Sequence, residues 1–504
     1  MTFLLSVLVF SPILGILLLL LTSKQHESNL KMFGFIGTVP PLLVSLILYQ
    51  YYASGASLAD FTIKNNWIRF ANLSQYDAKL FTVDYELSID GFSLVLVLMT
   101  ALLSSLAAFA SRSIKKEWKG YFILLLFLEI GMLGVFTAQN LVLFFLFFEL
   151  TLVSAFFLVG KWGFAEKEKA AYSFLIYNGI GSAILLLVIM ILFARAGTTN
   201  IQALTHIITI GGVPTIAPIS ASMKYALLVG LVAAFAIKLP IFPMHRWMVM
   251  VHVEAPTPIV MLHAGVLLKI GAYGMIRFGM GIFPEQFKSV AFYLAVLGVI
   301  NFLYGAFMAF IQTDFKRVLA YSSISHMGVV LIGLGSLQAA GIQGAVFQVV
   351  SHGLIAALLF YLVGIIQEKT DTSFIPDLGG LAKNMPRLSG WLLAGSFASL
   401  GLPGMSGFVS EFLAFLGLFK SEPWLAAIGA VGIVMTAVYM LRAVMGITFG
   451  KENEKHEHLT DLNALQQIPA GILLLLIISI GVYPSLLGEP LQRTLDAIMI
   501  GIGR

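Results

Sequence analysis

The chain of 504 residues is 59% hydrophobic and only 11% charged, and its mean hydropathy of +0.94 excludes an ordinary soluble domain, which needs far more polar surface. The formal net charge of +5 comes without a basic cluster, so it does not indicate nucleic-acid binding. The absence of cysteine excludes disulfides, thiolate-held iron–sulfur clusters and covalently attached c-type haem within this chain.

Apolar stretches long enough to cross roughly 30 Å of hydrocarbon recur along the chain and predict about fourteen transmembrane helices. They lie near residues 3–21, 32–53, 91–111, 121–138, 140–160, 171–194, 223–243, 257–278, 289–311, 317–336, 341–366, 389–419, 425–449 and 467–488. Their composition, rich in leucine, isoleucine, phenylalanine and glycine, favours helices over the alternating strands of an outer-membrane barrel. The predicted fold class is therefore an all-α polytopic membrane protein, with the polar loop 54–90 outside the bilayer.

Lysine and arginine residues in the loops predict the orientation, because positively charged loops stay on the cytoplasmic side. The loops that follow odd-numbered spans carry the larger share of these residues, at 29–31, 112–119, 161–169, 316–317 and 383–387. Both termini and the loop 54–90 are therefore expected on the outer face. The start of the chain lacks a charged leader and a small-residue cleavage site, so 4–21 is expected to remain as the first span.

Charged residues lie inside several apolar spans, and seven of them are the clearest. Five are deep and two lie nearer span ends: Glu129, Glu149, Lys238, Lys269 and Glu411, then Arg277 and Arg442. A charge at the bilayer centre costs at least about 2.5 kcal/mol, so such residues usually face the bundle or water and have a function. For the two arginines, a simpler interpretation is that the long side chain reaches the interface. We expect Lys238 and Lys269 to be functional.

Glu149 lies in an almost wholly aromatic segment, where a lone carboxylate needs a cationic partner to remain charged. Lys238 is the candidate partner. Such a pair is charged when closed and drifts toward neutrality when open, which couples movement to proton release. Pro240 and Pro243 follow Lys238 and are expected to break its helix, freeing carbonyl groups that water can hydrate.

Leu239-Pro240 follows Lys238, and a second Leu-Pro pair, at 402–403, precedes Glu411. Paired broken helices of this kind are typical of inverted-repeat transporters. His326 and His352 lie in apolar helices beside small residues. Each either satisfies a hydrogen bond in the core or relays protons, and the neighbouring lysines and acids favour the relay because histidine titrates near neutrality.

Other readings of these residues remain open at this point. Four further ionisable residues in or beside apolar spans, Glu129, His245, His252 and His263, are not assigned a role. Paired histidines also occur in haem sites, but haem gives no reason for the buried lysines. No phosphate loop, Rossmann turn or metalloprotease signature occurs.

Residues 236–277, AIKLPIFPMHRWMVMVHVEAPTPIVMLHAGVLLKIGAYGMIR, closely resemble the antiporter-like membrane subunits of respiratory complex I, the proton-pumping NADH:quinone oxidoreductase. Further matching motifs are LFFELTLV at 146–153, DFKRVLAYSSISHMG at 314–328, SHGLIAALLFYLVG at 351–364 and GLPGMSGFVSEF at 401–412. Subunits of multi-subunit Na⁺/H⁺ antiporters and membrane-bound hydrogenases share this plan. Glu411 resembles the M-type chains (mitochondrial subunit 4 type), because the other relatives generally carry lysine there.

This resemblance implies two inverted five-helix repeats with discontinuous helices. It divides the chain into N-terminal helices and outer loop (1–111), a first repeat (112–281), a second repeat (282–450) and a C-terminal helix and tail (451–504). The implied proton path consists of Glu149 paired with Lys238, Lys269 as central carrier, His326 and His352 along the axis, and Glu411 as terminal site.

The resemblance also implies that this chain holds no cofactor or metal. NADH, FMN, iron–sulfur clusters and quinone belong to partner subunits, and quinone reduction there drives the pump. The partners are other membrane subunits of complex I, the lipid bilayer and protons, in the inner membrane of a bacterial cell.

Two departures and two alternatives accompany this prediction. Residues 248–251 replace a Leu-Pro and polar position that are usual in the family, and His263 stands where a smaller apolar or polar residue is usual. One alternative function is a Na⁺/H⁺ antiporter subunit. The other is a membrane scaffold whose buried ion pairs only hold helices together.

Overall fold

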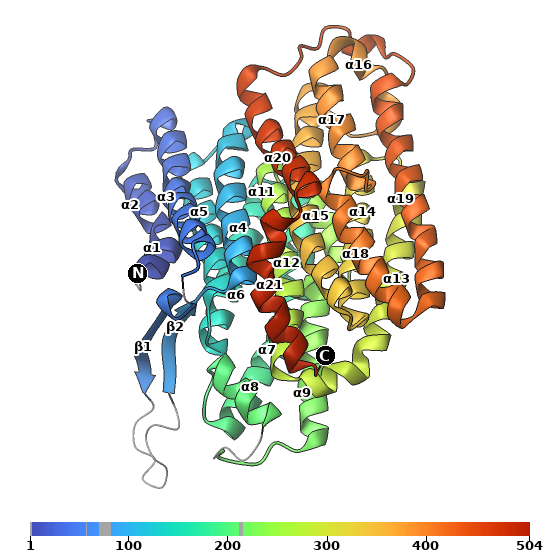
Figure 1. Cartoon of the computed structure of the whole chain (residues 1–504). Coiled ribbons are helices and arrows are strands. Elements are labelled where there is room, and N and C mark those ends of the chain that lie inside the picture. The colour runs from blue at the N-terminus through green and yellow to red at the C-terminus, as the bar shows by residue number, and fades with distance from the viewer. Residues whose placement is uncertain (1–2, 57, 70–81, 211–214, 504) are drawn as a thin grey trace.

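The computed structural model describes residues 3–56, 58–69, 82–210 and 215–503, which form a bundle of roughly parallel helices (Figure 1). In the first half of the chain the helices are α1 (Phe3–Phe10), α2 (Pro12–Leu21), α3 (Glu27–Ala53), α4 (Gly91–Ala110), α5 (Trp118–Thr137), α6 (Leu141–Trp162), α7 (Lys167–Ala196), α8 (Ile201–Thr209), α9 (Ala221–Lys238) and α10 (Arg246–Glu254). In the second half they are α13 (Pro284–Ile311), α14 (Phe315–Gly335), α15 (Ala339–Thr370), α16 (Leu381–Asn384), α17 (Pro386–Ser399), α18 (Ser406–Ser421), α19 (Pro423–Phe449), α20 (Ala464–Val482) and α21 (Ser485–Gly501).

A single continuous helical rod, residues 257–280, joins the two halves. It consists of α11 (Thr257–Leu262), a π-helical segment η4 (His263–Leu267), α12 (Lys269–Gly274) and a second π-helical segment η5 (Met275–Met280). Short 3₁₀ turns lie at Leu58–Phe61, Ser111–Ser113, Ile375–Asp377 and Glu454–His456. Wider π-helical turns inside α-helices often mark functional sites, and here they lie on both sides of Lys269.

The described part of the chain confirms a polytopic helical protein with slightly fewer separate spans than the fourteen predicted. It contains 12 helices long and apolar enough to cross a membrane, or 13 if α1 and α2, which meet at 42°, count as one span. The remaining predicted span, 389–419, is split into α17 and α18 by the turn around Pro403. The chain is therefore an all-α polytopic membrane protein, whereas its division into two five-helix repeats remains a prediction.

Helix ends follow from local sequence. Asp90, Asn140 and Asp314 accept hydrogen bonds from backbone N–H groups in the first turns of α4, α6 and α14, which satisfies donors that have no partner within the helix. The predicted span 223–243 is too long, because α9 ends at Lys238 ahead of Pro240. The last predicted span also ends early, at Val482, and α21 follows as a separate helix.

The loop 54–90, predicted as polar and outside the bilayer, contains an antiparallel pair of strands, β1 (Thr62–Arg69) and β2 (Thr82–Ser88). The pair lies below α1, α2 and α3 in Figure 1, toward the same end of the bundle as α8. We call this end the hairpin face. The opposite end, the lysine face, holds the loops that carry Lys115, Lys116 and Lys161, which line one cavity there.

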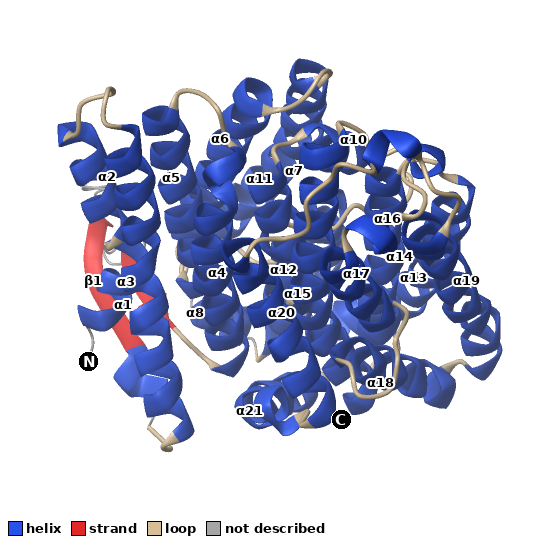
Figure 2. Ribbon diagram, turned by 90° about the horizontal axis from the view of Figure 1, so that it is seen from above, coloured by secondary structure: helices blue, strands red, loops and turns tan. Residues whose placement is uncertain are grey.

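Burial distinguishes the centre of the bundle from its flanks. In the most apolar segment of each helix, 100% of the residues are buried in the rod 257–280 and in α15, and 94% in α14. In α3, α7 and α19 only 39% are buried. Seen from above, α15 and the rod lie in the middle of the molecule (Figure 2). The helices that hold Lys269, His326 and His352 are therefore shielded from lipid by other helices.

Candidate functional site

Lys269 lies at the centre of the bundle in α12 and is fully buried. Its Nζ lies 2.6 Å from Nδ1 of His352 on α15 and 3.9 Å from Sδ of Met327 on α14. The first contact joins two groups that both bind protons, at hydrogen-bond distance. The structure therefore brings together two of the residues that the sequence predicts for the proton path.

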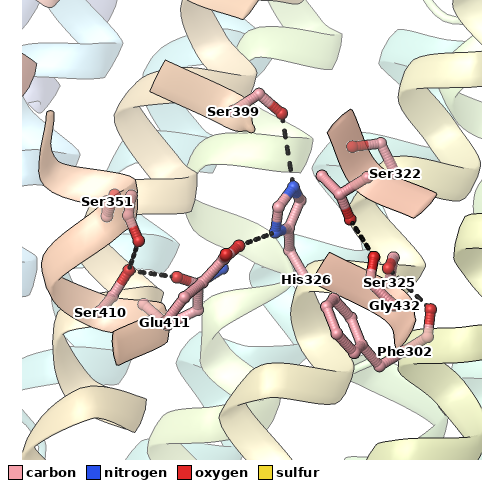
Figure 3. A network of polar contacts seen from close by, with 12 residues as sticks. Phe302, Ser322, Ser325, His326, Ser351, Ser399, Ser410, Glu411 and Gly432 are labelled. Carbon is pink, nitrogen blue, oxygen red and sulfur yellow. Dashed lines mark hydrogen bonds and ion pairs between the residues drawn. The ribbon is translucent and has the colours of Figure 1, made fainter. Parts of the chain in front are cut away.

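The chain of titratable groups continues from His352 to the far side of the bundle. The rings of His352 and His326 have centroids 5.4 Å apart, and Nδ1 of His326 lies 3.1 Å from Oε1 of Glu411 on α18. Nε2 of His326 contacts the Ser399 hydroxyl at 3.4 Å (Figure 3). Four of the six predicted residues therefore form a nearly continuous row across the second half of the molecule.

Serine hydroxyl groups line this row. Ser410 donates to the side-chain carbonyl of Gln348, and Ser351 and Ser406 contact each other at 2.8 Å. Figure 3 shows Ser351 and Ser410 on the side of Glu411, with Ser399 above His326. Small hydroxyl-bearing side chains leave polar groups beside the titratable residues without blocking them.

The first half of the molecule differs, because its predicted pair is not closed. Lys238 is 2% exposed, and neither its Nζ nor Oε1 of Glu149 has a hydrogen-bond partner in the part of the chain that the structure describes. Glu149 acts on Lys238 electrostatically, but no ion pair joins them among the described residues. Nζ faces the Phe148 and Phe174 rings instead, at 4.9 and 5.6 Å from their centroids. The end of α9 places this cation where the helix dipole favours positive charge.

Two histidines that the sequence left unassigned lie between the lysines. Nε2 of His252, on α10, is 2.9 Å from Nδ1 of His263, on the rod. The His263 ring packs against Phe174, which also faces Lys238, and interacts electrostatically with both Lys238 and Lys269. The pair therefore bridges part of the space from Lys238 toward Lys269. The signal for it was the unusual His263, but only the fold brings it to His252.

The remaining candidates lie off this row. Glu129 is completely buried on α5, and neither of its carboxylate oxygens has a hydrogen-bond partner within the described ranges. His245 contacts the Tyr304 hydroxyl at 3.1 Å near the break after α9. Arg442 donates to the backbone carbonyl of Phe310 from an exposed position, as expected for a side chain that reaches the interface. Arg277 does not fit that interpretation, because it forms a largely buried ion pair with Asp90.

The geometry suits the storage and transfer of protons. Titratable groups within hydrogen-bond reach pass a proton without large movement, whereas the unpaired groups around Lys238 require water or a shift of side chains. Within the described residues, no group of three or more His, Asp or Glu side chains is arranged to hold a metal ion.

A family profile described as "NADH:quinone oxidoreductase/Mrp antiporter, TM" matches residues 138–436. A relative named NAD(P)H-quinone oxidoreductase chain 4 2, from Thermosynechococcus vestitus, is 40% identical over 427 residues, which cover 82% of this chain and 78% of the relative. Among solved structures, a chain of respiratory complex I from Thermus thermophilus with bound NADH is 28% identical, with a TM-score of 0.86 and coverage of 99% and 100%. A chain of the Mrp complex from Dietzia sp. is 19% identical, with a TM-score of 0.81 and coverage of 100% and 97%, and shows the shared fold alone.

Proposed function

The chain belongs to the family of transmembrane subunits found in NADH:quinone oxidoreductases and Mrp antiporters, and we propose that it is the M-type proton-translocating membrane subunit of an NAD(P)H:quinone oxidoreductase of the complex I type. Its partners are the other membrane subunits of that complex. The observation that carries the proposal is the row Lys269–His352–His326–Glu411, which crosses the second half of a bundle enclosed by lipid-facing helices.

In the proposed mechanism, the two halves of the path do different work. Glu149 and Lys238 form the switch: when they approach, both are stabilised as charges, and when they separate, Lys238 favours release of its proton. The released proton passes by way of His263 and His252 toward Lys269. Lys269 then gives a proton from Nζ to Nδ1 of His352. His352 passes a proton to His326, and His326 delivers it to Glu411.

Redox chemistry is assigned to partner subunits in this proposal. NADH, FMN, iron–sulfur clusters and quinone are held there, and quinone reduction supplies the energy that moves the Glu149–Lys238 switch. The residues of this chain bind, hold and pass protons. Because the chain has no cysteine, it offers no thiolate ligand for an iron–sulfur cluster.

The protein is a multi-pass membrane protein, and we propose that it lies in the inner membrane of a bacterial cell. The lysine face is assigned to the cytoplasm, because Lys115, Lys116 and Lys161 gather in its loops. The hairpin face, with both chain ends, is assigned to the outside (Figure 1).

A Na⁺/H⁺ antiporter subunit is the alternative function, supported by the shared fold of the Mrp chain. Glu411 and the closer identity to the quinone oxidoreductase relative favour the first proposal over this one.

The proposal is tested by Lys238→Ala in the assembled complex, reconstituted into lipid vesicles. We expect proton pumping, followed with a pH-sensitive dye, to fall at least about tenfold for each quinone reduced, because the switch loses its only cation. Lys224→Ala is the matched control on the same helix, since Lys224 only donates to the backbone carbonyl of Ile208 at the hairpin face. Full pumping by Lys238→Ala would favour the scaffold interpretation.

A further inference from the structure

A cavity of ≈ 1010 Å³ lies at the hairpin face, beside the rod that carries Lys269. Its walls come from α8, α21, the end of the rod and the residues before α4. Gln202, His206 and Arg493 line it and are exposed, so the cavity reaches solvent. Its inner wall includes Asp90 and Arg277.

A column of polar side chains runs from this cavity toward Lys269. Lys269, Tyr273 and Arg277 are spaced four residues apart, so they stack along one face of the rod. Tyr273 is 1% exposed. Its hydroxyl oxygen lies 3.1 Å from Oγ of Ser93 and donates a hydrogen bond to the backbone carbonyl of Phe136 at 3.2 Å. Two hydroxyl groups therefore lie behind Arg277, and Tyr273 is one helical turn from Lys269 along the rod.

Arg277 closes the column at its cavity end. Its Nη2 lies 2.6 Å from Oδ2 of Asp90, and the two side chains are 20% and 16% exposed. The guanidinium also donates from Nε to the Tyr273 hydroxyl at 3.4 Å and from Nη2 to the Ser93 hydroxyl at 3.3 Å. Both hydroxyl oxygens thus accept hydrogen bonds from a cation.

An arginine in this place obstructs proton transfer for two reasons. The guanidinium is a donor only and does not give up its proton, so it is not a relay. Its positive charge repels an approaching proton, as fixed cations do in pores that exclude protons. The other charged groups that face the cavity add little opposing charge: Asp90 is already paired, and Arg493 is a second cation.

We propose that Arg277, held in place by Asp90, is an electrostatic plug that keeps protons on Lys269 from escaping through Tyr273 and Ser93 to the hairpin face. This inference rests on the proposed function, since it treats Lys269 as the carrier. It assigns the largely buried ion pair an insulating role: protons leave along the row to Glu411 and not past Arg277 into the cavity.

The plug is tested by the passive proton leak of vesicles that contain the assembled complex, after an external acid pulse and without NADH. We expect Arg277→Gln to raise the leak by about tenfold or more, because a charge barrier is removed from a hydroxyl column. Arg277→Lys keeps the positive charge and is expected to leave the vesicles tight. Arg442→Gln, at the exposed arginine of α19, is the matched control and should also leave them tight.

A second variant decides whether a leak uses the column. Tyr273→Phe removes only the hydroxyl, so the double variant Arg277→Gln with Tyr273→Phe should restore tight vesicles. A leak that persists in the double variant reports damaged packing and overturns the plug, as does an Arg277→Gln complex that is as tight as the unaltered one. If Arg277→Gln does not assemble because it leaves Asp90 without its cation, the double variant Asp90→Asn with Arg277→Gln replaces it. The same leak is expected, adding Tyr273→Phe should abolish that leak, and tight vesicles with Asp90→Asn and Arg277→Gln alone overturn the plug.

The leak is measured without quinone turnover, so it separates the two proposals. Lys238→Ala should stop pumping while the vesicles stay tight, whereas Arg277→Gln should leave quinone reduction intact and collapse the pH gradient. A Lys238→Ala complex that pumps normally contradicts the proposed function without changing the result for Arg277.

Discussion

The two halves of the polar axis differ in how their charged groups are held. Around Lys238 the surroundings are aromatic, and among the described residues neither this cation nor Oε1 of Glu149 has a hydrogen-bond partner. Between Lys269 and Glu411 the groups touch one another, and serine hydroxyl groups lie beside them. A buried group without a partner is costly, and it responds strongly to any charge that approaches. The first half is therefore suited to switching and the second to conduction.

Glu411→Gln tests the conducting half and should have the largest effect of the changes that follow. Glutamine keeps the shape and an acceptor near His326 but does not carry a proton away, so pumping per quinone reduced should fall by about five- to tenfold. Glu422→Gln is the control just beyond the C-terminal end of α18, because the Glu422 carboxylate accepts a hydrogen bond from exposed Trp424 and lies outside the row. Unchanged pumping would mean that protons leave the row before Glu411.

His263→Leu tests the space between the halves and should have a smaller effect. The change removes one partner of the 2.9 Å contact with His252 while it preserves packing against Trp247. We expect a loss of about two- to fourfold in pumping, measured as the initial rate of vesicle acidification, because water and His252 still cover part of the distance. An effect as large as that of Lys238→Ala would place the histidine pair in the switch itself.

Glu86→Gln concerns a carboxylate outside both halves, on β2, and should have the smallest effect. Burial raises the pKa of the Glu86 carboxyl above its ordinary value of 4.5, and the hydrogen bond from Asn200 and the nearby Lys64 only partly offset this. The folded state therefore favours the neutral acid. The stabilisation is present below the ordinary value and is lost as the pH rises through the raised pKa.

Hydrogen exchange of the β2 amides, corrected for its intrinsic pH dependence, measures this effect. Protection should decrease as the pH rises above 4.5 in the unaltered chain, and the glutamine variant should flatten that dependence while pumping stays unchanged. A flat profile in the unaltered chain would show that Asn200 and Lys64 fully compensate burial. Loss of pumping in the variant would connect the hairpin to the axis.

Hydrophobic pattern and proline positions are enough to predict most of the fold. Lipid requires helices of about 20 apolar residues, so the spans stand out in the sequence. The break after Lys238 follows from Pro240, and the split between α17 and α18 is signalled by Pro403. The π-helical segments around Lys269 and the pairing of β1 with β2 are not predictable in this way, because both depend on contacts between distant segments.

For the site, the sequence predicts which residues are candidates, but it does not predict how their side chains are arranged. Charged residues in apolar spans make Lys238, Lys269 and Glu411 candidates for the site from the sequence alone. It does not reveal that the pair of Lys238 with Glu149 is open, or that Arg277 meets Asp90 across 187 positions of the chain. Those facts depend on how α4, α6, α9 and the rod pack together.

The complete enclosure of the rod 257–280 has a consequence for how the bilayer itself acts on this protein. Membranes of different thickness exert their force on helices that touch lipid, through tilt and local deformation. All residues in the apolar segment of the rod are buried (100%), whereas only 39% are buried in the apolar segments of α3, α7 and α19. Changes in acyl-chain length should therefore be absorbed by the outer helices, and Lys269 should keep its neighbours in thin and thick membranes alike.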